Sequence, residues 1–259
     1  VRCWGWNKFG QLGLGHTDDI GDDELPKSAA KVDTGAPVRQ VSVGRRHVCA
    51  VIDQGHVRCW GWNKFGQLGL GHTDDIGDDE LPKSAAKVDT GAPVRQVSVG
   101  RRHVCAVIDQ GHVRCWGWNK FGQLGLGHTD TVGDDESPAS TEPVALKGPA
   151  RRVTTGSLHS CALLEDGKVQ CWGDNRFGQL GYGHKRNIGD KTTVESAGTV
   201  YLGAPARALA TGRFHNCALL EDRTVRCWGL NARGELGYGH TNDIGDDEPP
   251  GSVAGVQFR

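Results

Sequence analysis

The 259-residue sequence contains no methionine and no run of 18 apolar residues. The missing apolar run excludes a membrane-spanning helix. Thirty basic and 31 acidic residues leave a net charge of −1, which excludes the basic field that attracts nucleic acid or anionic lipid. A charged and then apolar leader is also missing. Together with the absent methionine, this indicates that the true start was removed or that the sequence is a segment of a longer protein.

A helical hydrophobic period is missing too, and the sequence has a long repeat instead. Residues 1–56 and 57–112 are identical, and residues 113–130 begin the repeat a third time. The spacing predicts a single repeat array over residues 1–259, because each repeat buries its apolar face against its neighbours. The repeats span residues 1–56, 57–112, 113–168 and 169–224, with a partial repeat at 225–259.

Each repeat predicts short β-strands. Val38–Val43 is rich in β-branched residues, His47–Ile52 follows a short loop, and Val57–Trp62 returns after a turn. A further segment near Ala29–Val32 is a candidate fourth strand. The fold class is therefore expected to be all-β, a β-propeller of about 56-residue four-stranded blades, with four whole repeats and a partial fifth. A solenoid is the alternative, although its repeats are usually shorter.

The turn between the last two strands predicts which cysteines face each other. Residues 53–55 have the pattern of a type I turn followed by a left-handed glycine, Gly55. In that register Cys49 faces Cys59 with Cα atoms about 4.5 Å apart, at the short end of the disulfide range. The same spacing predicts four disulfides: Cys49–Cys59, Cys105–Cys115, Cys161–Cys171 and Cys217–Cys227.

Other interpretations of the cysteines stay open. They could be reduced and buried as small apolar side chains, or Cys49 and Cys59 could bind Zn²⁺ together with His47. Disulfides are favoured because separate hairpins supply no obvious fourth zinc ligand, and they predict an oxidising compartment outside the cell. Cys3 has no partner in the sequence. Arg223 stands where other turns have glycine, at a cost on the order of 1 kcal/mol.

An acidic loop in the first repeat invites a Ca²⁺ interpretation, since hard cations bind clustered carboxylates. Its spacing does not match an EF-hand loop, and in residues 186–192 of the fourth repeat Asp190 of the Gly-Asp pair is the only acidic residue that remains. We therefore favour turn chemistry, in which the aspartate accepts hydrogen bonds from nearby amides. The acidic loops could also meet a basic partner. The candidate metal ligands are Asp18, Asp19, Asp22, Asp23 and Glu24.

Residues 156–183 read Gly-x-x-His-x-Cys-Ala-x-x-x-Asp-Gly-x-Val-x-Cys-Trp-Gly-x-Asn-x-x-Gly-Gln-Leu-Gly-x-Gly. This motif resembles the regulator of chromosome condensation repeat family. The resemblance implies a β-propeller, commonly seven-bladed, of which these repeats would be part, and the paired cysteines are similar to those of bacterial, exported members. The family includes an exchange factor for a small GTPase, plant light sensors and a secreted β-lactamase inhibitor. Membership alone therefore does not determine function.

No enzyme signature is found. Histidines open the second hairpin strand, but no nucleophile accompanies them outside the paired cysteines. We expect them to make structural hydrogen bonds, and we expect the eight tryptophans in the core or between blades. The histidines are His47, His103, His159 and His215.

We expect a non-catalytic, secreted or surface-exposed propeller without a cofactor, which binds a protein or another macromolecule through its loop faces. Two alternatives remain, a propeller for guanine-nucleotide exchange or signalling and a self-assembling structural repeat protein. The partial last repeat lacks the strands that would also precede Val1, and exposed sheet edges invite pairing with another chain. The sequence therefore predicts a fragment of a longer propeller, with an open ring or a homo-oligomer through incomplete terminal blades as alternatives.

Overall fold

The computed structural model describes residues 1–258 and is built from three-stranded antiparallel sheets joined by long loops. Contacts divide the chain into two compact units. The N-terminal unit comprises residues 1–109, 114–118 and 131–142, and the C-terminal unit comprises residues 110–113, 119–130 and 143 onward. Among residues 1–258, no helix is both long and apolar enough to cross a membrane.

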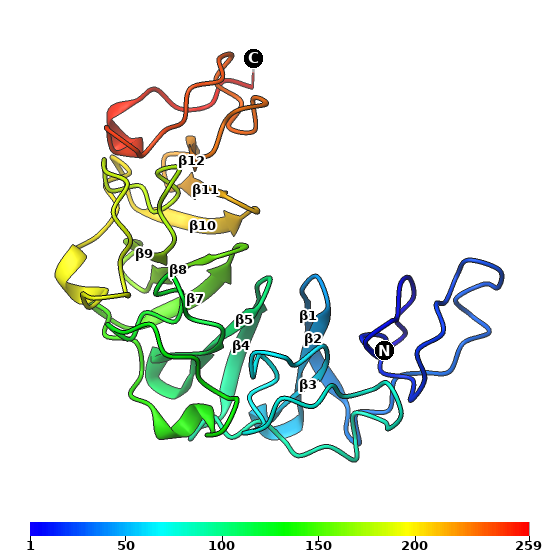
Figure 1. The fold of residues 1–259 in the computed structure, drawn as a ribbon. Helices are drawn as coiled ribbons and strands as arrows, with labels where there is room; N and C mark the ends of the chain where they lie inside the picture. The colour runs from blue at the N-terminus through cyan, green and yellow to red at the C-terminus, as the bar shows by residue number, and fades with distance from the viewer. Residues whose placement is uncertain (259) are drawn as a thin grey trace. The chain divides into compact units, whose positions relative to one another are not determined.

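The N-terminal unit holds two sheets, and the strands of each sheet lie in chain order (Figure 1). Val113, the first residue of the last of these strands, is assigned to the C-terminal unit. The first sheet consists of β1 (Val38–Val43), β2 (His47–Ile52) and β3 (Val57–Gly61). The second sheet consists of β4 (Val94–Val99), β5 (His103–Ile108) and β6 (Val113–Gly117). Short 3₁₀ segments lie at η1 (Asp53–Gly55), η2 (Asp109–Gly111) and η3 (Pro138–Ser140).

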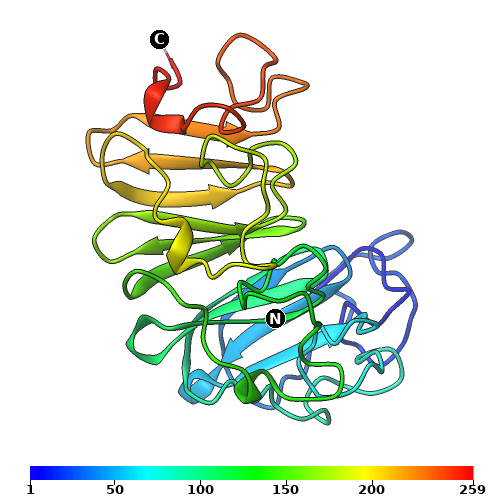
Figure 2. The same cartoon turned by 60° about the vertical axis from the view of Figure 1, so that its left-hand side comes forward.

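The C-terminal unit repeats this arrangement, with its strands side by side in Figure 2. Its first sheet consists of β7 (Ala150–Thr155), β8 (His159–Leu164) and β9 (Val169–Gly173). Its second sheet consists of β10 (Ala206–Thr211), β11 (His215–Leu220) and β12 (Val225–Gly229). The 3₁₀ segments here are η4 (Glu195–Ala197) and η5 (Pro250–Ser252).

The predicted strands are confirmed, with β3 one residue shorter than expected, but the fourth strand near Ala29–Val32 does not form. Val32 donates a single backbone hydrogen bond to Val1, N···O 3.0 Å, and in the next repeat Val88 forms an isolated bridge with Val57. A turn follows Val32 at once, because the Asp33 carboxylate accepts the Gly35 N–H at 3.0 Å. The chain therefore leaves the sheet after one paired residue.

The β2–β3 hairpin has the predicted register, with Cys49 opposite Cys59 and Val51 opposite Val57. The expected type I turn with one left-handed glycine is wrong here, since Gln54 (φ 62°) and Gly55 (φ 77°) both have positive φ. The left-handed region therefore starts one residue earlier than predicted. In the last hairpin Arg223 itself adopts φ 70°.

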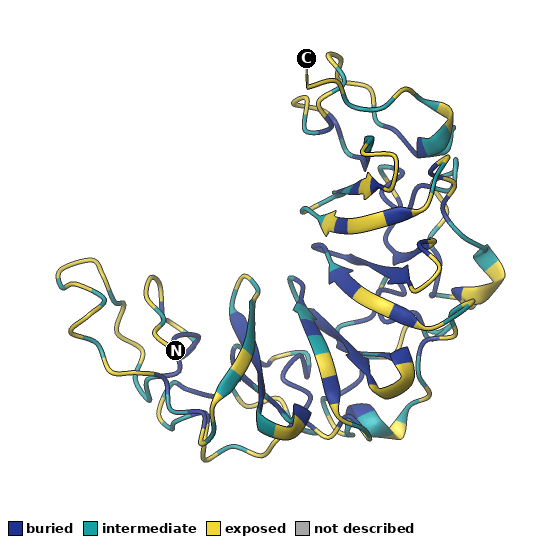
Figure 3. Ribbon diagram, turned by 180° about the vertical axis from the view of Figure 1, so that it is seen from behind, coloured by how far each residue is buried: buried dark blue, intermediate teal, exposed yellow. Residues whose placement is uncertain are grey.

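The core lies between neighbouring sheets, and β2, β5 and β8 are buried along their whole length (Figure 3). The tryptophan of each Cys-Trp-Gly triplet on β3, β6, β9 and β12 is fully buried. Trp60 donates its indole N–H to the Gln11 carbonyl at 3.1 Å, and Trp172 does the same to Gln123 at 3.0 Å. Each tryptophan thus joins its sheet to the loop of the preceding repeat.

Candidate protein-binding face

The hairpin topology brings two loops of the first sheet together. The β1–β2 loop ends at Arg46, and β3 is followed by Trp62. Because His47 pairs with Gly61 in the sheet register, Arg46 and Trp62 are neighbours, and the Trp62 N–H donates to the Arg46 carbonyl at 2.9 Å. The turn at 53–55 lies at the opposite end of the same hairpin. Each of the two ends of the sheet therefore carries its own loops.

Aromatic rings form a continuous ladder at the Arg46 end of the N-terminal unit. Ring centroids are 5.4 Å apart for Trp6 and Phe9, 6.0 Å for Phe9 and Trp62, 5.4 Å for Trp62 and Phe65, and 5.8 Å for Phe65 and Trp118. Trp6 is 45% exposed, and Trp62 and Trp118 are half-buried. Trp62 and Trp118 thus pack against the preceding repeat, as expected for tryptophans between blades, whereas the expectation is wrong for Trp6 and for Trp4, which are exposed.

Two arginines lie over the ladder. The guanidinium carbon of Arg46 is 5.0 Å from the Phe9 ring centroid and 5.2 Å from that of Trp62. One repeat later, Arg102 is 4.9 Å from Phe65 and 5.7 Å from the same Trp62 ring. These distances are typical of cation–π contacts. The arginine–aromatic face is defined here as Trp6, Phe9, Arg45, Arg46, Trp62, Phe65, Arg101, Arg102 and Trp118.

Positive charge is concentrated on this face. Burial lowers the pKa of Arg102, and the neighbouring charges of Arg101, Arg46 and Arg45 lower that pKa further. Among residues 1–258, Arg45, Arg46 and Arg102 form no ion pair. The four arginines and Trp62 line a small cavity of about 40 Å³. Arg45, Arg46 and Arg102 thus bring positive charge to this face without a carboxylate partner among the described residues.

The C-terminal unit differs at the equivalent positions. Ser157 and Leu158 replace the paired arginines, and Asp174 replaces the second tryptophan. Asp174 is buried and pairs with Arg176, Nε···O 2.9 Å, so that this guanidinium is neutralised within the chain. The sequence interpretation did not single out the paired arginines. Their signal was the Arg-Arg doublet, repeated at 45–46 and 101–102 together with a second tryptophan.

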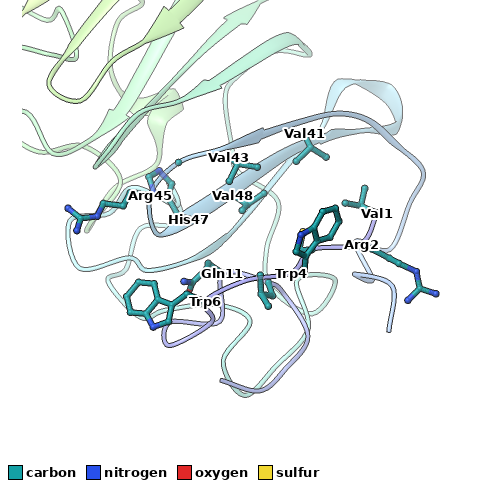
Figure 4. Close-up of a pocket in the computed structure, with 13 residues that line it drawn as sticks. Val1, Arg2, Trp4, Trp6, Gln11, Val41, Val43, Arg45, His47 and Val48 are labelled. Atoms are coloured by element: carbon teal, nitrogen blue, oxygen red, sulfur yellow. The ribbon is translucent and has the colours of Figure 1, made fainter. Parts of the chain in front are cut away.

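A second cavity, of about 390 Å³, lies beside β1 in the N-terminal unit (Figure 4). Val41, Val43 and Val48 line it from the sheet, and Trp4 lines it from the N-terminal segment. Trp4 is 62% exposed, whereas its equivalents in the later repeats are fully buried. Cys3 also lines this cavity as a free thiol, and partial burial raises its pKa.

The four predicted cysteine pairs are joined as disulfides, each inside one hairpin. Their Cα–Cα distances are 4.1 or 4.0 Å, slightly below the predicted separation. Each disulfide closes a loop between two strands that already pair. The bonds are Cys49–Cys59, Cys105–Cys115, Cys161–Cys171 and Cys217–Cys227.

The acidic loop divides into two groups. Carboxylate oxygens of Asp22, Asp23 and Glu24 lie within 4.8 Å of one another on the surface. Asp19 instead accepts the Asn7 N–H at 2.7 Å, and Asp18 points to His16 rather than to the cluster. Three of the five candidate metal ligands are therefore brought together, and two are not.

The Gly-Asp pair common to all repeats has a packing role. Gly77 adopts φ 97°, and a Cβ there would lie 2.5 Å from the Gly10 carbonyl oxygen. Gly15 of the same loop donates its N–H to the Gly77 carbonyl at 3.1 Å. The expected bond from the aspartate to a nearby amide is present at Asp190, which accepts the Lys191 N–H at 2.9 Å. Close backbone packing between repeats explains why the glycine is kept.

The histidines that open the second strands are largely structural. His47 and His159 are fully buried, and burial lowers their pKa values to about 3 and about 4, respectively. His159 Nε2 lies 3.2 Å from Asn216 Oδ1 on the next sheet, as the expected structural hydrogen bond requires. The neutral His159 imidazole thus joins two sheets of the C-terminal unit, whereas the expected hydrogen bond is not formed at His47, whose ring nitrogens are buried without a partner among the described residues.

Relatives with curated names match nearly the whole chain. The chain is 32% identical over 247 residues to the ultraviolet-B receptor UVR8 of Arabidopsis thaliana, covering 94% of this chain and 52% of the relative. It is 30% identical over 240 residues to a secretion-regulating guanine nucleotide exchange factor of Mus musculus, covering 90% and 49%. The chain thus spans about half the length of these curated relatives.

Solved structures agree on the fold. Yeast RCC1 (Prp20) bound to Kap60 superposes with a TM-score of 0.71 at 21% identity, over 95% of this chain and 56% of that one. Human WBSCR16 superposes with a TM-score of 0.69 at 22% identity, over 94% and 60%. A protein-family model described as an RCC1-like domain matches residues 1–258. The chain therefore belongs to the family of RCC1-like domains, and its sheets are blades of β-propeller type.

Proposed function

We propose that this protein is a non-catalytic, secreted or surface-exposed β-propeller that binds another protein through a loop face. The observation that carries the proposal is the arginine–aromatic face of the N-terminal unit. Tryptophan and arginine are the side chains that most often dominate binding energy in protein interfaces, while lysine and acidic residues are depleted there. On this face tryptophan and phenylalanine rings form one continuous ladder from Trp6 to Trp118, and two arginines lie over it.

The four hairpin disulfides support the secreted part of the proposal. Disulfides of this kind persist in oxidising compartments and are rare in the cytosol. Peptide mapping without reductant tests it on protein from its natural source: the four hairpin pairs are expected as disulfides. Free thiols at these eight cysteines would contradict secretion.

Site-specific photocrosslinking tests the binding face. A benzophenone side chain replaces Phe65 on the arginine–aromatic face, and in a matched control it replaces Gln54 at the opposite end of the sheets. After irradiation with the source organism's own extracellular proteins, discrete adducts are expected at position 65 and not at position 54. Equal labelling at both positions, or none, would contradict binding through this face.

A second candidate is nucleotide exchange, which the name of the mouse relative suggests. It differs from simple binding in a measurable way, because an exchange factor accelerates nucleotide release from a small GTPase. If a captured partner is a GTPase, faster release of a fluorescent guanine nucleotide in the presence of the chain would favour this candidate. An unchanged release rate would favour binding alone.

A further inference from the structure

We propose that the arginine–aromatic face binds an extended acidic segment of a protein partner, with carboxylates seated on the guanidinium groups of Arg46 and Arg102. This inference rests on the proposed function and names the chemistry of the partner. It depends on the charges, the geometry and the ring packing of the face.

The charge argument is that Arg46 and Arg102 have no carboxylate partner among residues 1–258. Arg39 and Arg95, on strands of the same two sheets, pair with Asp53 and Asp109, with N···O distances of 4.0 and 3.1 Å. Arg46 has no such pair, and its Nε is buried without a hydrogen-bond partner among the described residues. Buried donors are normally satisfied, and a carboxylate is the acceptor that a guanidinium binds best.

The geometry sets the spacing of the acidic residues. The guanidinium carbons of Arg46 and Arg102 lie 5.2 and 5.7 Å from the same Trp62 centroid, so their separation cannot exceed the sum of these distances. In an extended chain, side chains two residues apart are on the same side and about 7 Å apart. Two carboxylates separated by one residue lie within this limit on the separation of the guanidinium groups.

The cavity between the arginines gives the first carboxylate a place. Its volume of about 40 Å³ exceeds the roughly 10–15 Å³ that a single water needs. Arg45 and Arg101 line it together with Arg46, Arg102 and Trp62. Arg46 and Arg102 are half-buried, and partial removal from water strengthens an ion pair relative to one on an open surface.

The ring packing argues against nucleic acid as the ligand. Single-stranded nucleic acid binds by stacking bases on open aromatic faces. Here Trp62 and Phe65 are packed edge to face at 87°, and Arg46 and Arg102 lie over the Trp62 ring. The net charge of −1 also provides no long-range attraction for a phosphate backbone.

Fluorescence anisotropy tests the proposal on the whole chain. The probe is a labelled ten-residue peptide of alternating aspartate and glycine, which places carboxylates two residues apart. Saturable binding at low salt is expected, and the double variant Arg46→Gln/Arg102→Gln should raise the Kd at least about tenfold. The matched double variant Arg39→Gln/Arg95→Gln removes the same charge elsewhere on the two sheets and should change the Kd less than about twofold.

Several outcomes would overturn the proposal. They are absence of peptide binding at low salt, equal weakening by the two double variants, and tighter binding of inorganic phosphate or of a single-stranded oligonucleotide than of the acidic peptide. Circular dichroism and thermal unfolding confirm that each variant is folded. If photocrosslinking at position 65 succeeds while the acidic peptide does not bind, the partner chemistry is wrong and the proposed function stands. If both photocrosslinking and peptide binding fail, both the proposed function and the acidic partner are contradicted.

Discussion

At the scale of single residues, the protein places some side chains in conformations or environments that they disfavour. Arg223 adopts φ 70° at the position where Gly167 adopts φ 80° in the preceding hairpin. His159 is enclosed between two sheets of the C-terminal unit and stays neutral there. Arg223 is a change at one position of a copied repeat, whereas the histidine recurs at the same position as His47, His103 and His215.

Replacement of Arg223 by glycine is expected to stabilise the protein by about 1 kcal/mol, because a left-handed residue with a Cβ costs roughly that much. The reverse change, Gly167→Ala, is expected to destabilise it by more than that, since a Cβ at Gly167 would lie 2.7 Å from the Pro205 side chain. Urea unfolding of both variants measures the two effects. Equal stability of Arg223→Gly and the parent would show that the turn bears no strain.

Acid should destabilise the protein through its buried histidines. The folded-state pKa of His159 is about 4, below the usual 6.5 of the unfolded chain. The unfolded state therefore binds more protons as the pH falls below 6.5, and stability declines until about pH 4. We expect a loss on the order of 2 kcal/mol at pH 5 from this residue. Urea unfolding at pH 7.5 and 5.0 measures it, and a His159→Gln variant should lose less between these values. An identical loss in the variant would contradict the lowered pKa.

At the scale of elements, one side chain on the last strand of each sheet holds the following loop. Arg58 on β3 donates to the Pro82 carbonyl at 2.9 Å and also to the Ala85 carbonyl. In the C-terminal unit, Gln170 on β9 makes equivalent bonds to Gly198 at 2.8 Å and Val194 at 3.2 Å. A neutral amide thus performs the same task as the guanidinium.

Truncation of Arg58 to alanine should destabilise the protein by about 2 kcal/mol, because a charged donor to two carbonyls is lost. Arg58→Gln should recover part of this loss, since glutamine already serves at position 170. Arg39→Ala is the matched control, and its exposed ion pair should contribute less than about 0.5 kcal/mol. Thermal unfolding compares the three. If the glutamine variant is no better than alanine, charge rather than hydrogen bonding holds the loop.

At the scale of the whole molecule, close backbone contacts between repeats add to the side-chain core that lies between neighbouring sheets. In the C-terminal unit, a Cβ at Gly178 would lie 2.4 Å from the Asp246 N. The same contact occurs in the N-terminal unit between Gly66 and Asp134, at 2.3 Å. Stability in such an array is approximately a sum over repeats and their nearest-neighbour contacts.

Gly178→Ala should therefore loosen one part of the molecule and leave the rest intact. We expect a loss of at least 3 kcal/mol and faster amide exchange in β10–β12, with β1–β5 unchanged. The control is Gly239→Ala, since Gly239 has a similar φ of 77° and nothing within 4 Å of its added Cβ. It should cost only about 1 kcal/mol. Uniform loss of protection along the chain would show that the array unfolds as one unit.

The strands were predictable from the sequence because their signals are local. Val38–Val43 and His47–Ile52 carry β-branched runs bounded by turn residues, and the ten-residue spacing of Cys49 and Cys59 defines the hairpin register. The absence of the fourth strand was less predictable. Val32 forms a single backbone hydrogen bond, to Val1, and this contact lies far from Val32 in the sequence. Identification of the family was equally local, since one 28-residue motif carries it.

The candidate binding face was decided by tertiary structure. Trp60 and Trp62 are two residues apart in the sequence, yet Trp60 is fully buried and Trp62 belongs to the arginine–aromatic face. Alternation along a strand assigns them to the same side, and only the chain's exit from β3 at Gly61 separates them. The sequence by itself determined the repeat, through its 56-residue period, and the hairpin register and cysteine pairs, through the ten-residue spacing of the cysteines. The meeting of Arg46 and Arg102 over one indole required the packing of two repeats, because contacts between residues far apart in the chain leave no spacing signal in it.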